Sequence, residues 1–370
     1  MQNEEKTKVL LNNVLNIYRE NKITYYLKEY SNEPTPAFLW TYFGALGMMY
    51  QMSRLYPEDI AVLKEYKAML DHVVYYRNSD SNEVLAKYNS GKGCNTCEGT
   101  GDIFFDDNIW VARNMLFAYE VFDDKEYLKE AIRVTNFVYT GWNDEIGGLV
   151  WNENGLGSGA TEQELERGLS ANACSIIVSA ELYQITGDEK YLNWAPKFYE
   201  FCKKMQDSKS GMYYNGIHTI ITPEGNRSNG EVNKVLYSYN PGSMILADLL
   251  LYEVTGKDDY LVDAKLAAKA SYEGFVSNEN GIEYYTGYPW FAAILMEAFE
   301  ALSHYDSDYT STYIDVFKKS LSFAYINYMD KDGLLPSNPA KGFNGYDSND
   351  RQLLTQASFA EIHALLQLTK

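Results

Sequence analysis

The amino-acid sequence predicts an all-α fold, an (α/α)6 barrel built from six helical hairpins. Three observations support this prediction: helical periodicity along nearly the whole chain, a recurring phrase, and a regular alternation of short and long connections. No convincing series of strands interrupts the helical pattern. We therefore expect residues 1–370 to form a single domain.

The recurring phrase marks the turn between two helices. "ELYQITGDEKYL" spans 181–192, "LLYEVTGKDDYL" spans 250–261, and "AYEVFDDKEYL" at 118–128 is a looser copy without the Thr-Gly. Each copy ends one apolar helix, turns at a Gly or Asp, and begins another helix. The copies are spaced too widely for a single two-helix repeat of the tetratricopeptide type.

Extending this register along the chain predicts twelve helical segments. They span 4–29, 37–56, 58–77, 106–122, 125–140, 168–186, 188–206, 241–255, 257–275, 288–304, 308–328 and 351–368. From the second segment on, the connection after each even-numbered segment is short, and the one after each odd-numbered segment is long and rich in Gly, Asn and aromatic residues. Stacked hairpins of this kind place all long loops at one end, where binding and chemistry usually lie. An open helical solenoid is the alternative, but a count of twelve favours six hairpins in a closed ring.

The composition argues against several classes of partner. The chain carries 32 Lys and Arg against 51 Asp and Glu, a net charge of −19, so nucleic acids and anionic membranes are poor partners. No stretch reaches the roughly 18–20 apolar residues that a membrane span needs. The N-terminal "MQNEEKTKVLLNN" lacks the apolar core of a secretory signal. We expect a soluble monomer, cytoplasmic as written, or secreted or periplasmic if a signal peptide has been trimmed.

Cysteine and histidine offer little support for a metal site. Cys94 and Cys97 have CxxC spacing, but zinc needs about four ligands and no second pair exists, so a plain loop or a local disulfide is preferred. Cys174 and Cys202 lie in helical patterns and are interpreted as small buried hydrophobes. Of the four histidines, only His218 falls in a long loop. We expect no metal and no cofactor.

The stretch "GDIFFDDNIW" at 101–110 places Asp106 and Asp107 side by side at the start of a predicted helix. Aspartate is favoured at helix N-caps and in first turns, and this explains one of them. Two adjacent carboxylates flanked by Phe105 and Trp110 fit a solvated helix start less well. Counting 12 residues back from equivalent aromatics gives four helix starts, of which only the first carries a carboxylate: Asp107, Ala171, Asn240 and Gly287. Both interpretations, helix start and active site, stay open at this point.

Aromatic residues in the long loops and at the helix starts are candidate walls of a binding cleft. Tyr and Trp combine an apolar face with a polar tip, which suits sugar rings. The candidates are Trp142, Trp151, Tyr213, Tyr214, Tyr237, Tyr239, Tyr288 and Trp290. Because their loops or helix starts share the long-loop end, we expect Trp151, Tyr239, Asn240 and Trp290 to line a substrate-binding cleft around the aspartates.

These motifs resemble glycoside hydrolase family 76, the endo-α-1,6-mannanases of bacteria and fungi. The similar elements are "FFDDNIW", "GGLVW", "MYYNGI", "YSYNPG" and the Tyr-Leu phrases, in the same order from about Phe38 to the C-terminus. The resemblance implies an (α/α)6 barrel and retaining hydrolysis of α-1,6-mannosidic bonds in mannan or manno-oligosaccharides. It also implies that Asp106 is the nucleophile and Asp107 the acid/base. The sequence departs from the family pattern at Pro241, where Gln is usual, and at Val150-Trp151, where the family has Trp-Trp.

Two alternatives are considered beside the glycosidase. One is another sugar-active enzyme on the six-hairpin scaffold, an unsaturated glucuronyl hydrolase or an epimerase. The long loops offer only scattered cations for an acidic substrate, such as Arg167 and Arg227, and one histidine for an epimerase. The other is a glycan-binding protein without activity, against which the intact aspartate pair argues.

Overall fold

The computed structural model describes residues 3–22, 25–93, 98–157, 159–222, 224–344 and 348–369, and Cys94 and Cys97 lie outside them. Twelve α-helices occur in these ranges, one in each predicted segment. They are α1 (Asn3–Tyr18), α2 (Leu39–Leu55), α3 (Ile60–His72), α4 (Phe105–Phe122), α5 (Lys125–Tyr139), α6 (Leu169–Thr186), α7 (Glu189–Lys203), α8 (Tyr239–Thr255), α9 (Asp258–Phe275), α10 (Pro289–Ser303), α11 (Ser307–Asn327) and α12 (Leu353–Leu368). The helical prediction is confirmed to within a few residues for every helix except α1.

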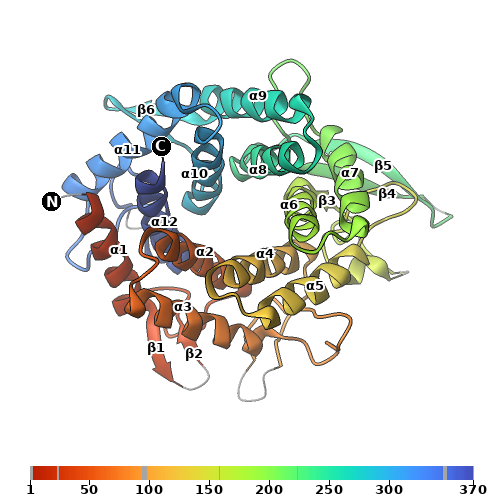
Figure 1. The fold of residues 1–370 in the computed structure, drawn as a ribbon, viewed down its shortest axis with the longest axis horizontal. Helices are drawn as coiled ribbons and strands as arrows, with labels where there is room; N and C mark the ends of the chain where they lie inside the picture. The colour runs from red at the N-terminus through yellow and green to blue at the C-terminus, as the bar shows by residue number, and fades with distance from the viewer. Residues whose placement is uncertain are drawn as a thin grey trace. The chain divides into compact units, whose positions relative to one another are not determined.

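The chain divides into two compact units, Met1–Val73 with Ala268–Lys370, and Val74–Ala267. In the unit 74–267, α4, α6 and α8 pack side by side, and α5 and α7 each pack on the outside of the preceding helix (Figure 1). The inner helices are buried around most of their circumference, whereas α5 and α7 bury only one stripe. This difference follows from the sequence, because a helix that is apolar all round must be covered on every side.

The unit formed by residues 1–73 and 268–370 has the same construction. Helices α10, α12 and α2 pack in a row, while α11 and α3 pack against their hairpin partners and α1 packs against α12 (Figure 1). Of the residues in α2, α10 and α12, most are buried, including the polar Gln51, Glu297 and Gln356. The alternation of short and long connections is also confirmed, since only two residues separate α4 from α5, α6 from α7 and α8 from α9.

The first predicted segment is too long. Helix α1 ends at Tyr18, and the chain then forms an antiparallel ribbon of β1 (Arg19–Lys22) and β2 (Tyr25–Leu27). The Tyr18 hydroxyl donates to the Arg351 carbonyl at 3.0 Å. The buried Glu29 carboxylate accepts from the Phe38 N–H and the Thr41 hydroxyl, both at 2.9 Å, and so caps the start of α2. These long-range contacts redirect the chain, and local periodicity carries no record of them.

Two further sheets decorate the long connections. The hairpin of β4 (Gly216–Ile221) and β5 (Arg227–Asn233) is extended by the two-residue strand β3 (Arg167–Gly168), in the order β3-β4-β5. Strands β6 (Val276–Glu279) and β7 (Ile282–Tyr285) form a second hairpin before α10. No strand series was predicted, and these strands stay confined to loops.

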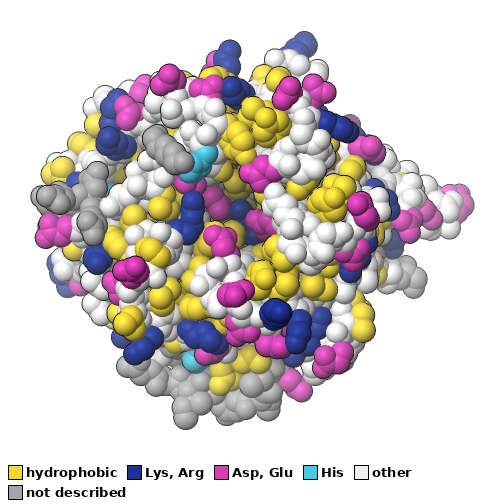
Figure 2. Space-filling model, in the orientation of Figure 1, with side chains coloured by type: hydrophobic (Ala, Val, Ile, Leu, Met, Phe, Trp, Pro, Cys, Tyr) yellow, Lys and Arg dark blue, Asp and Glu magenta, His cyan; other side chains and the backbone are white. Residues whose placement is uncertain are grey.

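Figure 2 shows Asp and Glu side chains scattered among Lys and Arg on the face in view, without a single acidic or basic area. None of the described helices is long and apolar enough to cross a membrane.

The recurring phrase has a conformational cause. Gly187 and Gly256 end α6 and α8 in the left-handed region, with φ of 68° and 67°, and Asp188 then caps α7 by accepting from the Lys190 N–H at 3.0 Å. In the copy without Thr-Gly, Asp123 takes the same conformation with φ of 50°. A side chain is disfavoured there, which explains why glycine recurs at this point.

We expect Asp123→Gly to stabilise the protein and Gly187→Ala to destabilise it, each by about 0.5–1 kcal/mol, because only glycine adopts this conformation without strain. Urea denaturation at neutral pH measures both. No atom lies within 4 Å of a Cβ built on Gly187, so steric crowding does not enter. Shifts of the same sign for the two variants would contradict this explanation.

Candidate active site at the start of helix α4

The two aspartates lie in the first turn of α4. The helix begins at Phe105, and the capping residue Phe104 has an extended backbone (φ −97°, ψ 136°) without a side-chain cap. Asp106 and Asp107 are therefore the second and third residues of the helix, and neither is its N-cap. The Asp107 N–H donates to Asp106 Oδ1 at 2.9 Å, so one free donor of the helix is satisfied within the pair.

The backbone before this turn is fixed by a buried asparagine. Asn108 Oδ1 accepts from the Tyr88 N–H at 2.7 Å, and its Nδ2 donates to the Phe104 carbonyl at 2.7 Å. The Phe105 N–H donates to the Trp151 carbonyl at 3.0 Å, and the rings of Phe104 and Trp151 lie 4.8 Å apart. The helix start and the loop that carries Trp151 are thus held as one piece.

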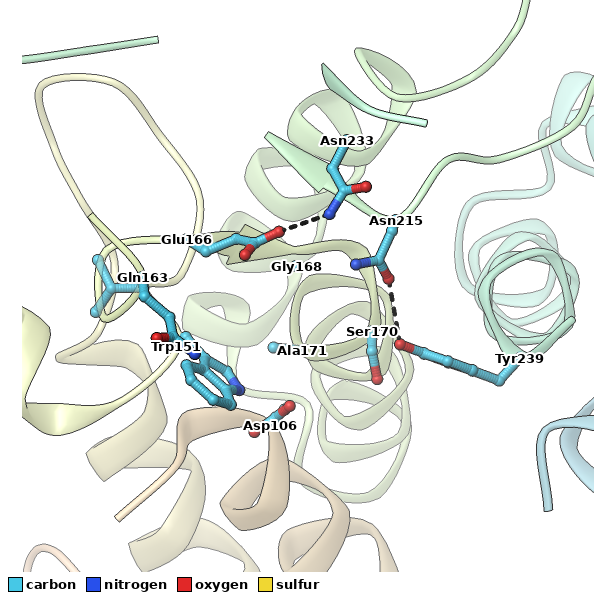
Figure 3. Close-up of a pocket in the computed structure, with 11 residues that line it drawn as sticks. Asp106, Trp151, Gln163, Glu166, Gly168, Ser170, Ala171, Asn215, Asn233 and Tyr239 are labelled. Carbon is cyan, nitrogen blue, oxygen red and sulfur yellow. Dashed lines mark hydrogen bonds between the residues drawn. The ribbon is translucent and has the colours of Figure 1, made fainter. Parts of the chain in front are cut away.

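A cavity of about 250 Å3 opens beside Asp106, entirely within the unit 74–267. Residues from the first turns of α4, α6 and α8 form part of it, and the loops and strands between them form the rest (Figure 3). The lining residues are Asp106, Val150, Trp151, Gln163, Glu166, Gly168, Ser170, Ala171, Asn215, Asn233 and Tyr239. Carboxylate, amide, hydroxyl and aromatic groups around a small cavity form a site suited to a polar ring such as a sugar.

The volume of the cavity beside Asp106 does not distinguish it from other cavities of the protein. Two others in the unit of residues 1–73 and 268–370 measure about 300 Å3, beside Lys8 and Glu65, and about 260 Å3, beside Tyr284 and Asn338. The cavity at Asp106 differs because a carboxyl group with a raised pKa lines its wall, next in sequence to a second such group, that of Asp107. Titratable groups with shifted pKa values in a cleft are often found at functional sites.

Burial raises the pKa of both carboxyl groups. Both residues are half-buried. Desolvation raises the pKa of Asp106 to about 6, opposed by hydrogen bonds from the backbone N–H groups of Asp107 and Asp106 and from the Trp151 side chain. Desolvation, with the charge of Asp106 added, raises the pKa of Asp107 well above its usual range. The two adjacent carboxyl groups interact, so ionisation of one raises the pKa of the other and the pair favours a state that holds one proton.

The predicted binding residues divide into three groups. Trp151 and Tyr239 line the cavity with Asp106, and the Tyr239 hydroxyl donates to Asn215 Oδ1 at 3.4 Å. Asn240 is fully buried behind the lining, and its Nδ2 lies 3.5 Å from the same Asn215 oxygen. Trp290 belongs to the other unit, where it is 7% exposed and packs against Trp40 and Phe43. Its role in binding stays a prediction.

Some expected aromatic walls belong to the core instead. Trp142 packs against Trp194 and Phe198 at ring distances of 6.0 and 5.3 Å, and Tyr213 is fully buried. Neither lines the cavity, so the cleft prediction was wrong for both. Tyr237 is exposed and does not line the cavity, and it stacks on Tyr239 with ring centroids 5.7 Å apart.

Several lining residues were missed in the sequence. Ser170 is adjacent to Ala171, which the repeat register had placed at a helix start, so the register came within one residue of it. Asn215 follows the Tyr213-Tyr214 pair that was singled out. Glu166 and Asn233 are 67 residues apart and meet only through the β3-β4-β5 sheet, where Asn233 Nδ2 donates to Glu166 Oε1 at 3.0 Å. No local pattern reveals such a pair.

Arg167, expected among the scattered loop cations, is fully buried and does not line the cavity. Burial lowers the pKa of its guanidinium group to about 10. The group donates five hydrogen bonds to uncharged oxygens on β4, β5 and the loop before Trp151: Thr219 Oγ1, the carbonyls of Ile146, Gly147 and His218, and Asn229 Oδ1. Arg167 is thus a structural cross-link beneath the site.

Among the described residues, no group of three His, Cys, Asp or Glu side chains is arranged to hold a metal ion. Cys174 and Cys202 are free and buried, which confirms their interpretation as small hydrophobes.

Known proteins share this architecture. A family 76 glycoside hydrolase from Bacteroides thetaiotaomicron, described as a mannosidase, superposes with a TM-score of 0.84 at 21% identity, covering 99% of this chain and 98% of that one. The GH76A α-1,6-mannanase of Salegentibacter sp. HEL1_6 superposes with a TM-score of 0.79 at 22% identity, covering 100% of both chains. This likeness confirms the fold class, an all-α helical barrel of hairpins.

Sequence comparison reaches the same group. A mannan endo-1,6-α-mannosidase from Candida glabrata is 24% identical over 229 residues, which are 60% of this chain and 47% of that protein. The chain thus spans about half the length of the curated relatives it matches. The model of glycosyl hydrolase family 76 matches residues 2–368.

Fold, carboxyl pair and sugar-sized cavity together place the protein among the helical-barrel glycoside hydrolases. The chain belongs to glycosyl hydrolase family 76.

The raised pKa values of Asp106 and Asp107 predict that ionisation of these groups lowers the free energy of unfolding. A carboxyl group whose pKa is higher in the folded protein stabilises the fold below its unfolded pKa, and this contribution is lost as the pH rises through the folded value. We therefore expect Asp107→Asn to raise the free energy of unfolding by about 1–2 kcal/mol at pH 8 and to leave it nearly unchanged at pH 4. Urea titrations at the two pH values test this, and an equal effect at both would contradict it.

A further prediction concerns the buried side chain of Arg167, which we expect to stabilise the fold. We expect Arg167→Met to lower the free energy of unfolding by roughly 3–5 kcal/mol, because a buried guanidinium group and its five hydrogen bonds are lost. Arg227→Met is the control, since Arg227 makes one hydrogen bond to the Gly155 carbonyl and is half-exposed. Comparable losses in the two variants, measured by urea denaturation, would show that the buried network adds nothing.

Proposed function

We propose that the protein is a retaining glycoside hydrolase that cleaves α-1,6-mannosidic bonds in mannan-type polysaccharides or oligosaccharides. The observation that carries this proposal is the pair Asp106 and Asp107 in the first turn of α4, with raised and separated pKa values, beside a cavity lined by Trp151 and Tyr239. Retaining glycosidases need two carboxyl groups of this kind, one ionised and one protonated.

Related proteins support both the bond and the residues. The relative from Salegentibacter is described as an α-1,6-mannanase, and a variant of it with two consecutive aspartates replaced by asparagine is described as inactive and bound to α-1,6-mannotriose. This chain has three pairs of adjacent aspartates, at 106–107, 123–124 and 258–259. The second pair turns the chain between α4 and α5, and the third is exposed at the start of α9. Only the first contributes to a cavity lining.

In the proposed mechanism Asp106 is the ionised nucleophile and Asp107 the protonated acid, the roles that the family resemblance implies. Asp106, ionised at neutral pH, attacks the anomeric carbon of a mannosyl unit in the cavity. The bond from that carbon to the leaving oxygen breaks as Asp107 transfers its proton to this oxygen, which leaves a mannosyl ester on Asp106. Asp107, now ionised, takes a proton from water, and the water oxygen displaces Asp106 from the anomeric carbon. Two displacements restore the α configuration and both carboxyl groups.

The remaining predicted residues act as binding groups in this proposal. Trp151 and Tyr239 offer aromatic faces to the sugar C–H groups, and the half-buried Asn215 offers an amide to its hydroxyls. Asn240 supports Asn215 from behind, and Trp290 contributes a further binding surface. We propose that residues 1–370 act as a single catalytic domain and as a monomer, in keeping with a family match that spans 2–368.

The negative charge of the cavity lining argues against the alternative that the protein is another six-hairpin enzyme, one that acts on acidic sugars. The cavity is lined by two carboxylates, and no Lys, Arg or His is among its lining residues. An unsaturated glucuronyl substrate would meet repulsion there, and an epimerase would lack a histidine base.

The decisive experiment is incubation with unbranched α-1,6-mannan, with release of oligosaccharides followed over time. A ladder of α-configured products supports the proposal, with mannose alone indicating exo action. No release from this polymer or from α-1,6-mannotetraose, or products of inverted configuration, would refute it.

We expect Asp106→Asn to lower kcat at least about 10³-fold on every substrate, because the nucleophile is lost. Asp107→Asn should lose as much on mannan but regain its first step on an aryl mannoside whose leaving group needs no proton. The parent activity should rise with pH through about 6, as Asp106 ionises. Asp259→Asn, the same change at the exposed second residue of α9, is the control and should retain full activity. Near-full activity of either catalytic variant would contradict the assignment.

A further inference from the structure

The cavity beside Asp106 contains a second, separate carboxylate. Glu166 comes directly before β3, its side chain is 26% exposed, and it lies across the cavity from Asp106 in Figure 3. The mechanism proposed above gives this group no role.

The position of the Glu166 side chain is fixed by the sheet. Asn233, on β5, donates from Nδ2 to Glu166 Oε1 at 3.0 Å, and β4 lies between β5 and β3 in register. The next residue, Arg167, directs its guanidinium group into the core and away from the cavity, as expected for neighbours along an extended chain. The carboxylate is therefore held at the cavity wall while the adjacent positive charge is used elsewhere.

The contact with Asn233 does not require a negative charge. An amide N–H needs only an acceptor oxygen, which a glutamine would supply equally well. No described residue donates a hydrogen bond to Glu166 Oε2. The hydrogen bond to Asn233 thus does not need the negative charge of Glu166, and this charge can interact with a molecule in the cavity.

The cavity offers no described cation to compensate this charge. Its lining contains Asp106 and Glu166 but no Lys or Arg, and the nearest basic group is His218, with Nδ1 4.0 Å from Glu166 and a half-exposed side chain. The charge of Glu166 also reaches Tyr239, where burial chiefly, and then the charges of Asp106, Tyr237 and Glu166, raise the pKa of the hydroxyl. Any ligand in the cavity is therefore exposed to an unbalanced negative field.

We propose that Glu166 determines charge selectivity in this cavity, excluding mannosides that carry a phosphate or carboxylate and admitting neutral or amine-bearing ones. The proposal rests on the proposed function, since it assumes that a mannosyl unit occupies the cavity. Glu166 accepts a hydroxyl or ammonium hydrogen bond through Oε2 and repels an anionic substituent at the same place.

The test uses ligands that bind without turnover. Sulfur-linked α-1,6-mannobiose resists hydrolysis, and its non-reducing terminal C6 group is varied as hydroxyl, phosphate or amine. Isothermal calorimetry at low ionic strength gives Kd for each ligand with the parent protein, Glu166→Gln and Glu162→Gln. Glu162 is exposed in the same loop and does not line the cavity, so its variant makes the same change in net charge without changing the lining.

We expect the parent to bind the phosphate derivative at least about tenfold more weakly than the neutral ligand. Glu166→Gln should reduce this ratio about tenfold and remove any preference for the amine. Glu162→Gln should leave the ratio as in the parent. An unchanged ratio in Glu166→Gln, or an equal change in Glu162→Gln, would overturn the proposal while leaving the glycosidase function intact. Failure of the neutral ligand to bind any variant would overturn the function, and this inference with it.

Discussion

Burial of the inner helices on every side is the constraint on which the site depends. Because α4, α6 and α8 are covered along their length, their polar groups can meet a ligand only at their ends. The cavity is lined from those ends, by Asp106, Ser170 and Tyr239, each within the first two residues of its helix. The same packing that stabilises the fold thus limits which residues of these helices face the cavity.

The start of helix α4 exposes the two carboxyl groups to opposing electrostatic effects. Free N–H groups and the positive end of the helix dipole favour ionised carboxylates, whereas burial and mutual repulsion disfavour them. At Asp106 the backbone N–H groups and Trp151 offset part of the desolvation, and at Asp107 the charge of Asp106 adds to it. Two neighbours in sequence thus meet different electrostatic surroundings, because their hydrogen bonds differ.

Around this pair, hydrogen bonds from buried polar side chains hold the loops in place. Asn108 fixes the backbone that enters α4, and Arg167 ties the β3-β4-β5 sheet to the loop before Trp151. The sheet in turn presents Glu166, Asn215 and Asn233 to the cavity. Asp106 and Asp107 thus belong to a helix, whereas Glu166, Asn215 and Asn233 lie on or beside the strands of a sheet.

The sequence alone determined the helices, their pairing into hairpins and the helix start that carries the aspartates. These features are local: apolar periodicity, a glycine or aspartate at a left-handed turn, and acidic residues in a single copy of a repeat. Tertiary structure decided the rest. Tyr18 ends α1 through a partner at Arg351, Trp142 joins a core cluster, and Glu166 meets Asn233 through a sheet that joins distant segments. Contacts between residues far apart in the chain leave no periodic trace, so only the folded molecule reveals which loop residues surround the site.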